Sequence, residues 1–243
     1  MATTAPRCGG AGLAAPARNL ALRVASALVL APLAVGAAYV GGWLFVVFWA
    51  IAAVVVLWEW ISVTASGQSG ARAIWIVAGV GYSAVLLLAP VLLRRDASDG
   101  VLALVFLFAV VWSTDVLGYF GGRALGGPKL APSISPKKTW SGAVAGALGA
   151  MALTAAGARY IGGFNIAAIA VLAVILSIAA QLGDLMESKI KRHFGAKDAG
   201  HIIPGHGGLM DRLDGFWAAA LVACLIGLAR GGFDGAARGL LVW

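Results

Sequence analysis

The sequence predicts an all-α protein, a polytopic helical bundle that crosses a membrane about seven times. Hydrophobic residues make up 61% of the 243 residues, and only 12% are charged. The mean hydropathy of +0.92 exceeds that of water-soluble domains. Several apolar runs also reach the roughly 20 residues that a membrane-spanning helix needs. We therefore expect residues 20–243 to form one integral membrane domain.

Each expected span is a run of mostly apolar residues, and frequent Ala and Gly within the runs favour close helix packing in lipid. Residues 1–19, rich in Ala, Gly, Pro and Thr, are expected to be a disordered basic tail. The N-terminal helices occupy residues 20–111, and the half with most of the polar residues occupies 112–230. The expected spans are 20–40, 43–63, 73–93, 101–120, 142–160, 164–185 and 213–229.

Short polar segments separate these spans in order. Gly41 and Gly42 form a turn after the first span, and a Gly/Ser-rich loop with Arg72 follows the second. The patch 94–100 precedes the fourth span, and a basic loop, 121–140, follows it. A short turn containing Arg159 joins the fifth span to the sixth, and a long polar segment precedes the last.

The distribution of positive charge predicts the orientation of the bundle. The two loops that follow the fourth and sixth spans are rich in Lys and Arg, and two helices separate them, so they lie on one side. The positive-inside rule makes that side cytoplasmic, in the cell membrane, although Arg94 and Arg95 fall on the other side. We assign the net charge of +8 to these loops and to attraction for anionic membrane lipids, and we expect no nucleic acid partner.

Carboxylates stand where membrane spans begin or end, at Asp115, Asp184, Asp211 and Asp214. An ionisable group at the bilayer centre costs about 2.5–3.5 kcal/mol, so we expect these side chains to converge on a water-filled pocket. Mg²⁺ prefers such oxygen ligands. The alternative is that the carboxylates are helix caps or partners of nearby Lys and Arg. Glu59, between two tryptophans, is interpreted as an interfacial residue.

The segment 188–214 is the one long polar stretch, and it contains all three histidines. Gly207 and Gly208 would let the backbone approach a ligand closely, because glycine has no Cβ. His206, next to them, is a candidate for phosphate binding or proton transfer, and a structural role is equally open. Such a mixture of cations, carboxylates and glycines favours a nucleoside triphosphate and a divalent metal as ligands.

The loop 121–140 carries a second group of candidate phosphate-binding residues. Backbone N–H groups and hydroxyls there would supplement two ammonium groups. The alternative is an ordinary basic loop at the lipid surface. No Walker-type P-loop motif occurs in the chain. The candidates are Ser135, Lys137, Lys138 and Thr139.

Taken together, these residues resemble the phosphatidate cytidylyltransferase (CDP-diacylglycerol synthase) family. Eleven fixed positions of its C-terminal signature are matched within residues 188–214, and its Ser-Pro-x-Lys-Thr-Trp segment is matched at 135–140. Gly183 and Asp184 match its Gly-Asp pair, and Asp115 and Tyr119 match its Asp–Tyr stretch. The eleven positions are Ser188, Lys191, Arg192, Lys197, Asp198, His206, Gly207, Gly208, Asp211, Arg212 and Asp214.

The resemblance implies a step of phospholipid biosynthesis in which CTP and phosphatidic acid give CDP-diacylglycerol and pyrophosphate. Mg²⁺ would be held by Asp184, Asp211 and Asp214, and the family allows a second, monovalent cation; a homodimer is left open. The implied catalytic residues are Asp184, Asp211, Asp214, Lys191, Arg192 and His206. The implied substrate-binding residues are Ser188, Lys197, Asp198, Gly207, Gly208, Arg212, Ser135, Lys137, Lys138, Thr139 and Asp115.

Two other classes of function are weighed against this one. A related membrane enzyme would use another lipid phosphate or a lipid alcohol, but the Asp-Gly…Ala-Arg start of CDP-alcohol phosphotransferases is absent from the sequence. A transporter places charge near the bilayer midplane between repeated, broken helices. Here the charge gathers toward one side and no repeat stands out.

Overall fold

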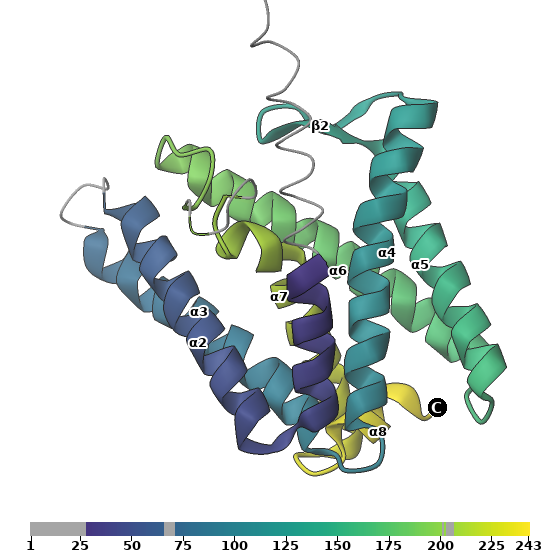
Figure 1. The fold of residues 1–243 in the computed structure, drawn as a ribbon. Helices are drawn as coiled ribbons and strands as arrows, with labels where there is room; N and C mark the ends of the chain where they lie inside the picture. The colour runs from purple at the N-terminus through teal and green to yellow at the C-terminus, as the bar shows by residue number, and fades with distance from the viewer. Residues whose placement is uncertain (1–27, 66–70, 201, 203–206) are drawn as a thin grey trace, which may run out of the picture.

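The computed structural model describes residues 28–65, 71–200, 202 and 207–243, which form a helical bundle (Figure 1). Six of its helices are long and apolar enough to cross a membrane, as expected for a multi-pass membrane protein. They are α2 (Gly42–Thr64), α3 (Arg72–Arg95), α4 (Gly100–Leu125), α5 (Trp140–Ile161), α6 (Ile166–His193) and α7 (Met210–Gly231). A shorter apolar helix, Leu28–Val40, precedes them, and α8 (Ala236–Leu241) follows.

The all-α membrane fold predicted from the sequence is confirmed, and each of the last six predicted spans corresponds to one helix, with α6 beginning two residues later than predicted. Two helices run further than their apolar parts: α4 reaches Leu125, and α6 continues as helix to His193. The predicted tail 1–19 and the start of the first predicted span lie outside the described residues. The sequence reasoning did not foresee α8 or a two-stranded hairpin, β1 (Lys129–Ala131) and β2 (Ser135–Thr139).

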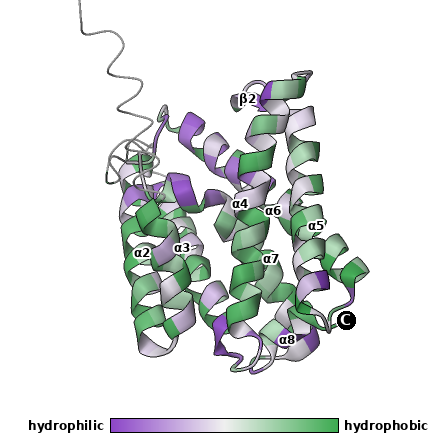
Figure 2. Ribbon diagram, turned by 45° about the vertical axis from the view of Figure 1, so that its right-hand side comes forward, coloured by the Kyte–Doolittle hydropathy of each residue, from purple (hydrophilic) through white to green (hydrophobic). Residues whose placement is uncertain are grey.

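The hydrophilic parts of the chain gather at the two ends of the bundle, and the middle is hydrophobic (Figure 2). The end opposite α8 carries the hairpin, the C-terminus of α6 and the N-terminus of α7 (Figure 1). The two basic loops therefore share one end, as the sequence predicts. That this end faces the cytoplasm stays a prediction.

Glycines let α4 and α5 pack with their backbones in contact. A Cβ on Gly142 would lie 2.7 Å from Gly118 O, and one on Gly146 would lie 2.7 Å from Thr114 O. Gly118 and Gly122 on α4, like Gly142 and Gly146 on α5, are four residues apart, the spacing of the GxxxG packing motif. The close contact fixes the C-terminal end of α4 against the helix that the hairpin leads into.

The crossing of α6 and α7 depends on Gly183 in the same way. A Cβ at this position would lie 2.6 Å from both the backbone oxygen of Asp214 and the Cβ of Ala218. Aromatic rings tie α7 to the N-terminal half: Trp49 of α2 stacks on Phe216 with ring centroids 4.9 Å apart. The position of α7 is thus determined by both halves of the chain.

At the other end of the bundle, the predicted polar patch holds helix termini together. Arg94 Nε donates to Ala38 O (2.6 Å), at the end of the first helix. Asp96 accepts from Ser98 Oγ (2.8 Å) and from Arg238 N (3.0 Å), which anchors α8. Burial alone would raise the pKa of Asp96, but these hydrogen bonds outweigh burial and hold the pKa below its usual value. Arg94 therefore has backbone carbonyl partners at this end, which account for a positive charge on the side that the positive-inside rule leaves poor in Lys and Arg.

We predict that Gly183→Ala separates α6 from α7, because the methyl group would meet backbone. Over-packing of this kind costs about 1–3 kcal/mol, so the melting temperature in detergent should fall. Gly157→Ala on α5 is the matched control, since its Cβ would meet nothing within 4 Å; it should leave the melting temperature unchanged or slightly raised. Equal melting curves for the two variants would contradict the close crossing.

Candidate active site

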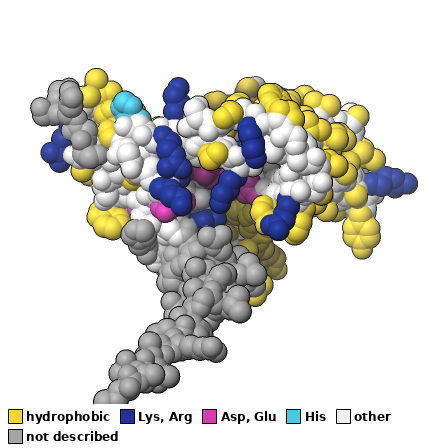
Figure 3. Space-filling view, turned by 90° about the horizontal axis from the view of Figure 1, so that it is seen from above, with side chains coloured by type: hydrophobic (Ala, Val, Ile, Leu, Met, Phe, Trp, Pro, Cys, Tyr) yellow, Lys and Arg dark blue, Asp and Glu magenta, His cyan; other side chains and the backbone are white. Residues whose placement is uncertain are grey.

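Seen from the end that carries the hairpin, Lys and Arg side chains surround a small group of acidic ones (Figure 3). The continuous helix α6 supplies one side of this group. Ser188 Oγ donates to Asp184 Oδ1 (3.3 Å), one helical turn away, and Lys191 lies a further turn along. Because α6 is helical through these positions, Asp184, Ser188 and Lys191 lie on one face of the helix.

The hairpin brings the second basic loop to α6. Strands β1 and β2 pair antiparallel, and Trp140 N donates to Pro128 O (3.1 Å) at their base. Thr139 then caps α5 by accepting a hydrogen bond from Gly142 N (3.2 Å). One residue earlier, Lys138 Nζ forms an ion pair with Asp184 Oδ2. The hairpin thus contacts the end of α6 that leads into the segment 188–214.

Three carboxylates interact at the α4–α6–α7 junction. The charge of Asp214 interacts with those of Asp184 and Asp115, and Asp115 also interacts with Lys138 and Arg212. Asp115 is exposed on α4, whereas Asp184 and Asp214 are half-buried. Asp214 Oδ1 accepts from Gly215 N (2.7 Å). Three neighbouring negative charges repel one another unless cations neutralise them.

A separate, buried ion-pair network lies beside these carboxylates. Lys191 Nζ is 2.5 Å from Asp211 Oδ1 and 2.9 Å from Glu187 Oε1. The side chains of Lys191, Asp211 and Glu187 are only 10%, 8% and 1% exposed. Asp211 also accepts from Ala199 N and Gly208 N, both 2.9 Å from its Oδ2. Both of its oxygens are therefore engaged, and they hold Ala199 and Gly208 against α7.

A carboxylate from the N-terminal half completes this region. Glu59 Oε1 accepts from Leu209 N (3.0 Å), and Oε2 accepts from Met210 N (2.7 Å), at the start of α7. Glu59 is fully buried, so its interpretation as an interfacial residue is wrong. Its partners are 150 residues away along the chain, and no local sequence pattern indicates them. Glu187 was also missed, although its i,i+4 spacing to Lys191 could have revealed it.

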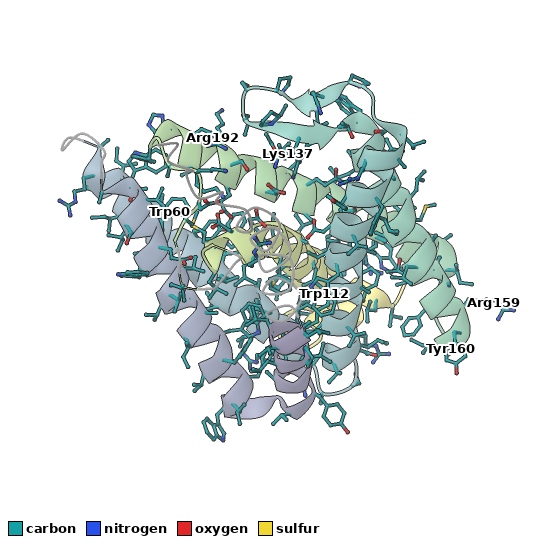
Figure 4. The ribbon with its side chains drawn as sticks, turned by 45° about the horizontal axis from the view of Figure 1, so that its top comes forward. Trp60, Trp112, Lys137, Arg159, Tyr160 and Arg192 are labelled. Atoms are coloured by element: carbon teal, nitrogen blue, oxygen red, sulfur yellow. The ribbon has the colours of Figure 1, made fainter. Side chains whose placement is uncertain are left out.

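The other predicted site residues are mostly exposed at the surface. Lys137, Arg192, Lys197, Asp198 and Arg212 are exposed, and Gly207 has the positive φ of 87° that favours glycine. Lys137 and Arg192 lie at the same end of the bundle, and Arg159 and Tyr160 lie at the opposite end (Figure 4). Ser135 is half-buried in the hairpin. His206 lies outside the described residues, so its role stays a prediction.

The donor chemistry of the site suits a hard divalent cation. Asp115, Asp184 and Asp214 offer carboxylate oxygens, and Lys138 is an ion-pair partner that can exchange. Among the residues that the structure describes, no three acidic, His or Cys side chains are already close enough to form a complete metal cage. Mg²⁺ commonly keeps several water ligands and takes one or two carboxylates, so such a cage is not required.

Comparison with known proteins identifies the family. Residues 68–228 match the model of the Cytidylyltransferase family, and this range covers α3 to α6, most of α7 and both basic loops. The chain belongs to this family. The matched range also contains every site residue described above except Glu59, which precedes it.

Several curated relatives are named phosphatidate cytidylyltransferase. The protein of Brucella abortus biovar 1 (strain 9-941) is 54% identical over 156 residues, which cover 63% of this chain and 57% of the relative. The protein of Rickettsia felis (strain ATCC VR-1525 / URRWXCal2) is 35% identical over 224 residues, which cover 89% of this chain and 96% of the relative. The match thus spans little more than half of the Brucella protein but nearly all of the Rickettsia protein.

We predict strong coupling between Lys191 and Asp211. Removing one partner of a buried ion pair typically costs about 3–5 kcal/mol, because the other charge is left unpaired. Lys191→Met should therefore lower the melting temperature in detergent strongly. Adding Asp211→Asn to this variant should lower the melting temperature little further, because the second substitution removes one of the carboxylates that Lys191→Met leaves unpaired. Additive losses in this double-mutant cycle would show that the two side chains are not paired.

Proposed function

We propose that the protein is a phosphatidate cytidylyltransferase, which transfers the cytidylyl group of CTP to phosphatidic acid. An oxygen of the lipid phosphate attacks the α-phosphorus of CTP and forms a new P–O bond. The bond from the α-phosphorus to the oxygen that bridges to the β-phosphorus breaks, and pyrophosphate leaves with the electron pair. The products are CDP-diacylglycerol and pyrophosphate.

The observation that carries the proposal is the meeting of the Lys138 hairpin with the α6–α7 carboxylates at one end of a membrane bundle. Membership of the Cytidylyltransferase family and the names of the relatives support it. Both reactants are anionic, so the site must offset their repulsion. A phosphate monoester is already largely ionised at pH 7, because its second pKa is about 6, and no strong general base is needed. Positioning and electrostatic stabilisation are sufficient for such a transfer.

We propose that Mg²⁺ binds at Asp184 and Asp214, with Asp115 nearby. A bound Mg²⁺ would supply positive charge that offsets the negative charge developing on the phosphate groups in the transition state. Asp211, the third predicted ligand, has both oxygens engaged by Lys191 and by backbone N–H groups, so we propose that it mainly positions Lys191. A second, monovalent cation and a homodimer remain proposals of the same kind.

The basic residues are proposed to hold the two phosphate groups. Lys138 can exchange Asp184 for a phosphate oxygen, and the exposed Arg192 and Arg212 can bind phosphate in a bidentate manner. Lys137, Lys197 and Ser188 would add contacts from the two loops. Asp115, which is exposed on the membrane-spanning α4, would lie beside the lipid headgroup in this proposal.

The test is an assay of purified protein in detergent with CTP labelled at the α-phosphate. With phosphatidic acid and Mg²⁺, label should enter the lipid fraction, and pyrophosphate should appear in equal amount. Asp214→Asn is the inactive control. Label entering lipid with diacylglycerol but not with phosphatidic acid would favour a different lipid substrate. No labelled lipid with either acceptor would contradict the proposed function.

We predict that Lys138→Ala lowers kcat/KM for CTP or for phosphatidic acid. One charge-assisted hydrogen bond is worth about 1.5–3 kcal/mol, so the loss should be about 10- to 100-fold. Lys129→Ala on the same hairpin is the matched control, because Lys129 is an exposed residue of β1. It should keep normal kinetics. If the two variants have the same kinetic constants, Lys138 does not contact substrate.

A further inference from the structure

We propose that Glu59 of α2 is a positioning residue that fixes the start of α7, and with it Asp211 and Asp214, in the geometry needed for catalysis. The inference rests on the proposed function. It assigns a role in the site to the N-terminal half, at a position that precedes the residues matched by the family model.

Glu59 supplies a cap that α7 lacks in its own sequence. The N–H groups at the start of a helix have no partner within the helix. The residue at the N-cap position of α7 is Leu209, whose side chain has no group that accepts a hydrogen bond. Both oxygens of Glu59 accept from this end, at 3.0 Å from Leu209 N and 2.7 Å from Met210 N. The negative charge also interacts favourably with the positive end of the helix dipole.

The Glu59 carboxylate lies close against Gly200 and Gly208. A Cβ on Gly200 or on Gly208 would lie 2.7 Å from Glu59 Oε1. A side chain at either position would therefore push the carboxylate out of place. Glu59 itself is fully buried on α2, where Trp49 stacks on Phe216 of α7. The contact joins a buried part of the N-terminal half to Gly200 and to Gly208.

The consequence for the site follows from the position of the carboxylates on α7. Asp211 directly follows Met210, and Asp214 lies one turn later. Gly208 N, next to Leu209, donates to Asp211 Oδ2 (2.9 Å). A shift of this helix end would move both carboxylates relative to Asp184 on α6. Misplacement by about 1 Å can cost on the order of 100-fold in rate.

The first test compares Glu59→Gln with Thr64→Val, a control for a buried polar group on the same helix. Gln keeps the volume of Glu, but its NH₂ group cannot accept the second hydrogen bond. We expect Glu59→Gln to lower kcat/KM about 10- to 100-fold, to raise the Mg²⁺ concentration for half-maximal rate, and to speed amide hydrogen exchange at Leu209 and Met210. Thr64→Val should leave all three unchanged at a similar melting temperature.

Each contrary result has a definite meaning. Unchanged exchange at Leu209 and Met210 in Glu59→Gln would show that the cap does not exist. Faster exchange with the same kcat/KM and the same Mg²⁺ dependence as Thr64→Val would make Glu59 merely structural. If the unsubstituted protein forms no CDP-lipid, the proposed function fails instead, and the exchange measurement still reports on the cap.

A second test uses the close contact with Gly200. Gly200→Ala alone should lower kcat/KM, because its methyl group would displace the carboxylate. In a Glu59→Ala background, Gly200→Ala should lower kcat/KM no further, because the carboxylate that it would displace is absent. Independent, additive losses would overturn the proposed contact.

Discussion

The site depends on the close crossing of α6 and α7 at Gly183. Without a Cβ at this position, the backbone of α6 lies directly against Asp214 O and Ala218. The next residue on α6 is Asp184. This crossing therefore brings the carboxylates of Asp184 and Asp214 close together, although the two residues are 30 positions apart in the sequence. The glycine contacts between α4 and α5 then bring Lys138 to Asp184. Small residues thus act here by setting the separation of charged ones.

The charges of the site divide into a buried ion-pair network and a more accessible group. Lys191 is buried between Glu187 and Asp211, and such an arrangement requires both charge and hydrogen-bond partners to offset desolvation. In the second group, Asp115 is exposed and the Asp184 side chain, which forms the ion pair with Lys138, is 30% exposed. A cation gains more by joining this second group than by displacing Lys191 from the first. The buried network of Glu187, Lys191 and Asp211 is therefore distinct from the accessible carboxylates that are suited to bind a cation.

The sequence predicts much of this because membrane proteins restrict where charge can lie. Apolar run lengths predict the last six spans. Carboxylates at the ends of spans point to the candidate site, whose role stays a prediction. The hairpin was missed because its strands are only three and five residues long, too short for an alternating pattern to indicate them. Glu59 was missed for a different reason. A cap supplied across 150 residues leaves no periodic or local signal, and a Glu between tryptophans resembles an interfacial anchor.

The location of the charged groups also bears on the class of function. A transporter needs its binding site near the middle of the bilayer, so that either side can open to it. Here the carboxylates, Lys138 and the start of α7 all lie at one end of the bundle, beside the exposed Asp115 of α4. A water-soluble nucleotide can reach such a site from outside the membrane, and a lipid headgroup can reach it from within the adjoining leaflet. An enzyme that joins these two kinds of substrate needs this arrangement, whereas a transporter does not.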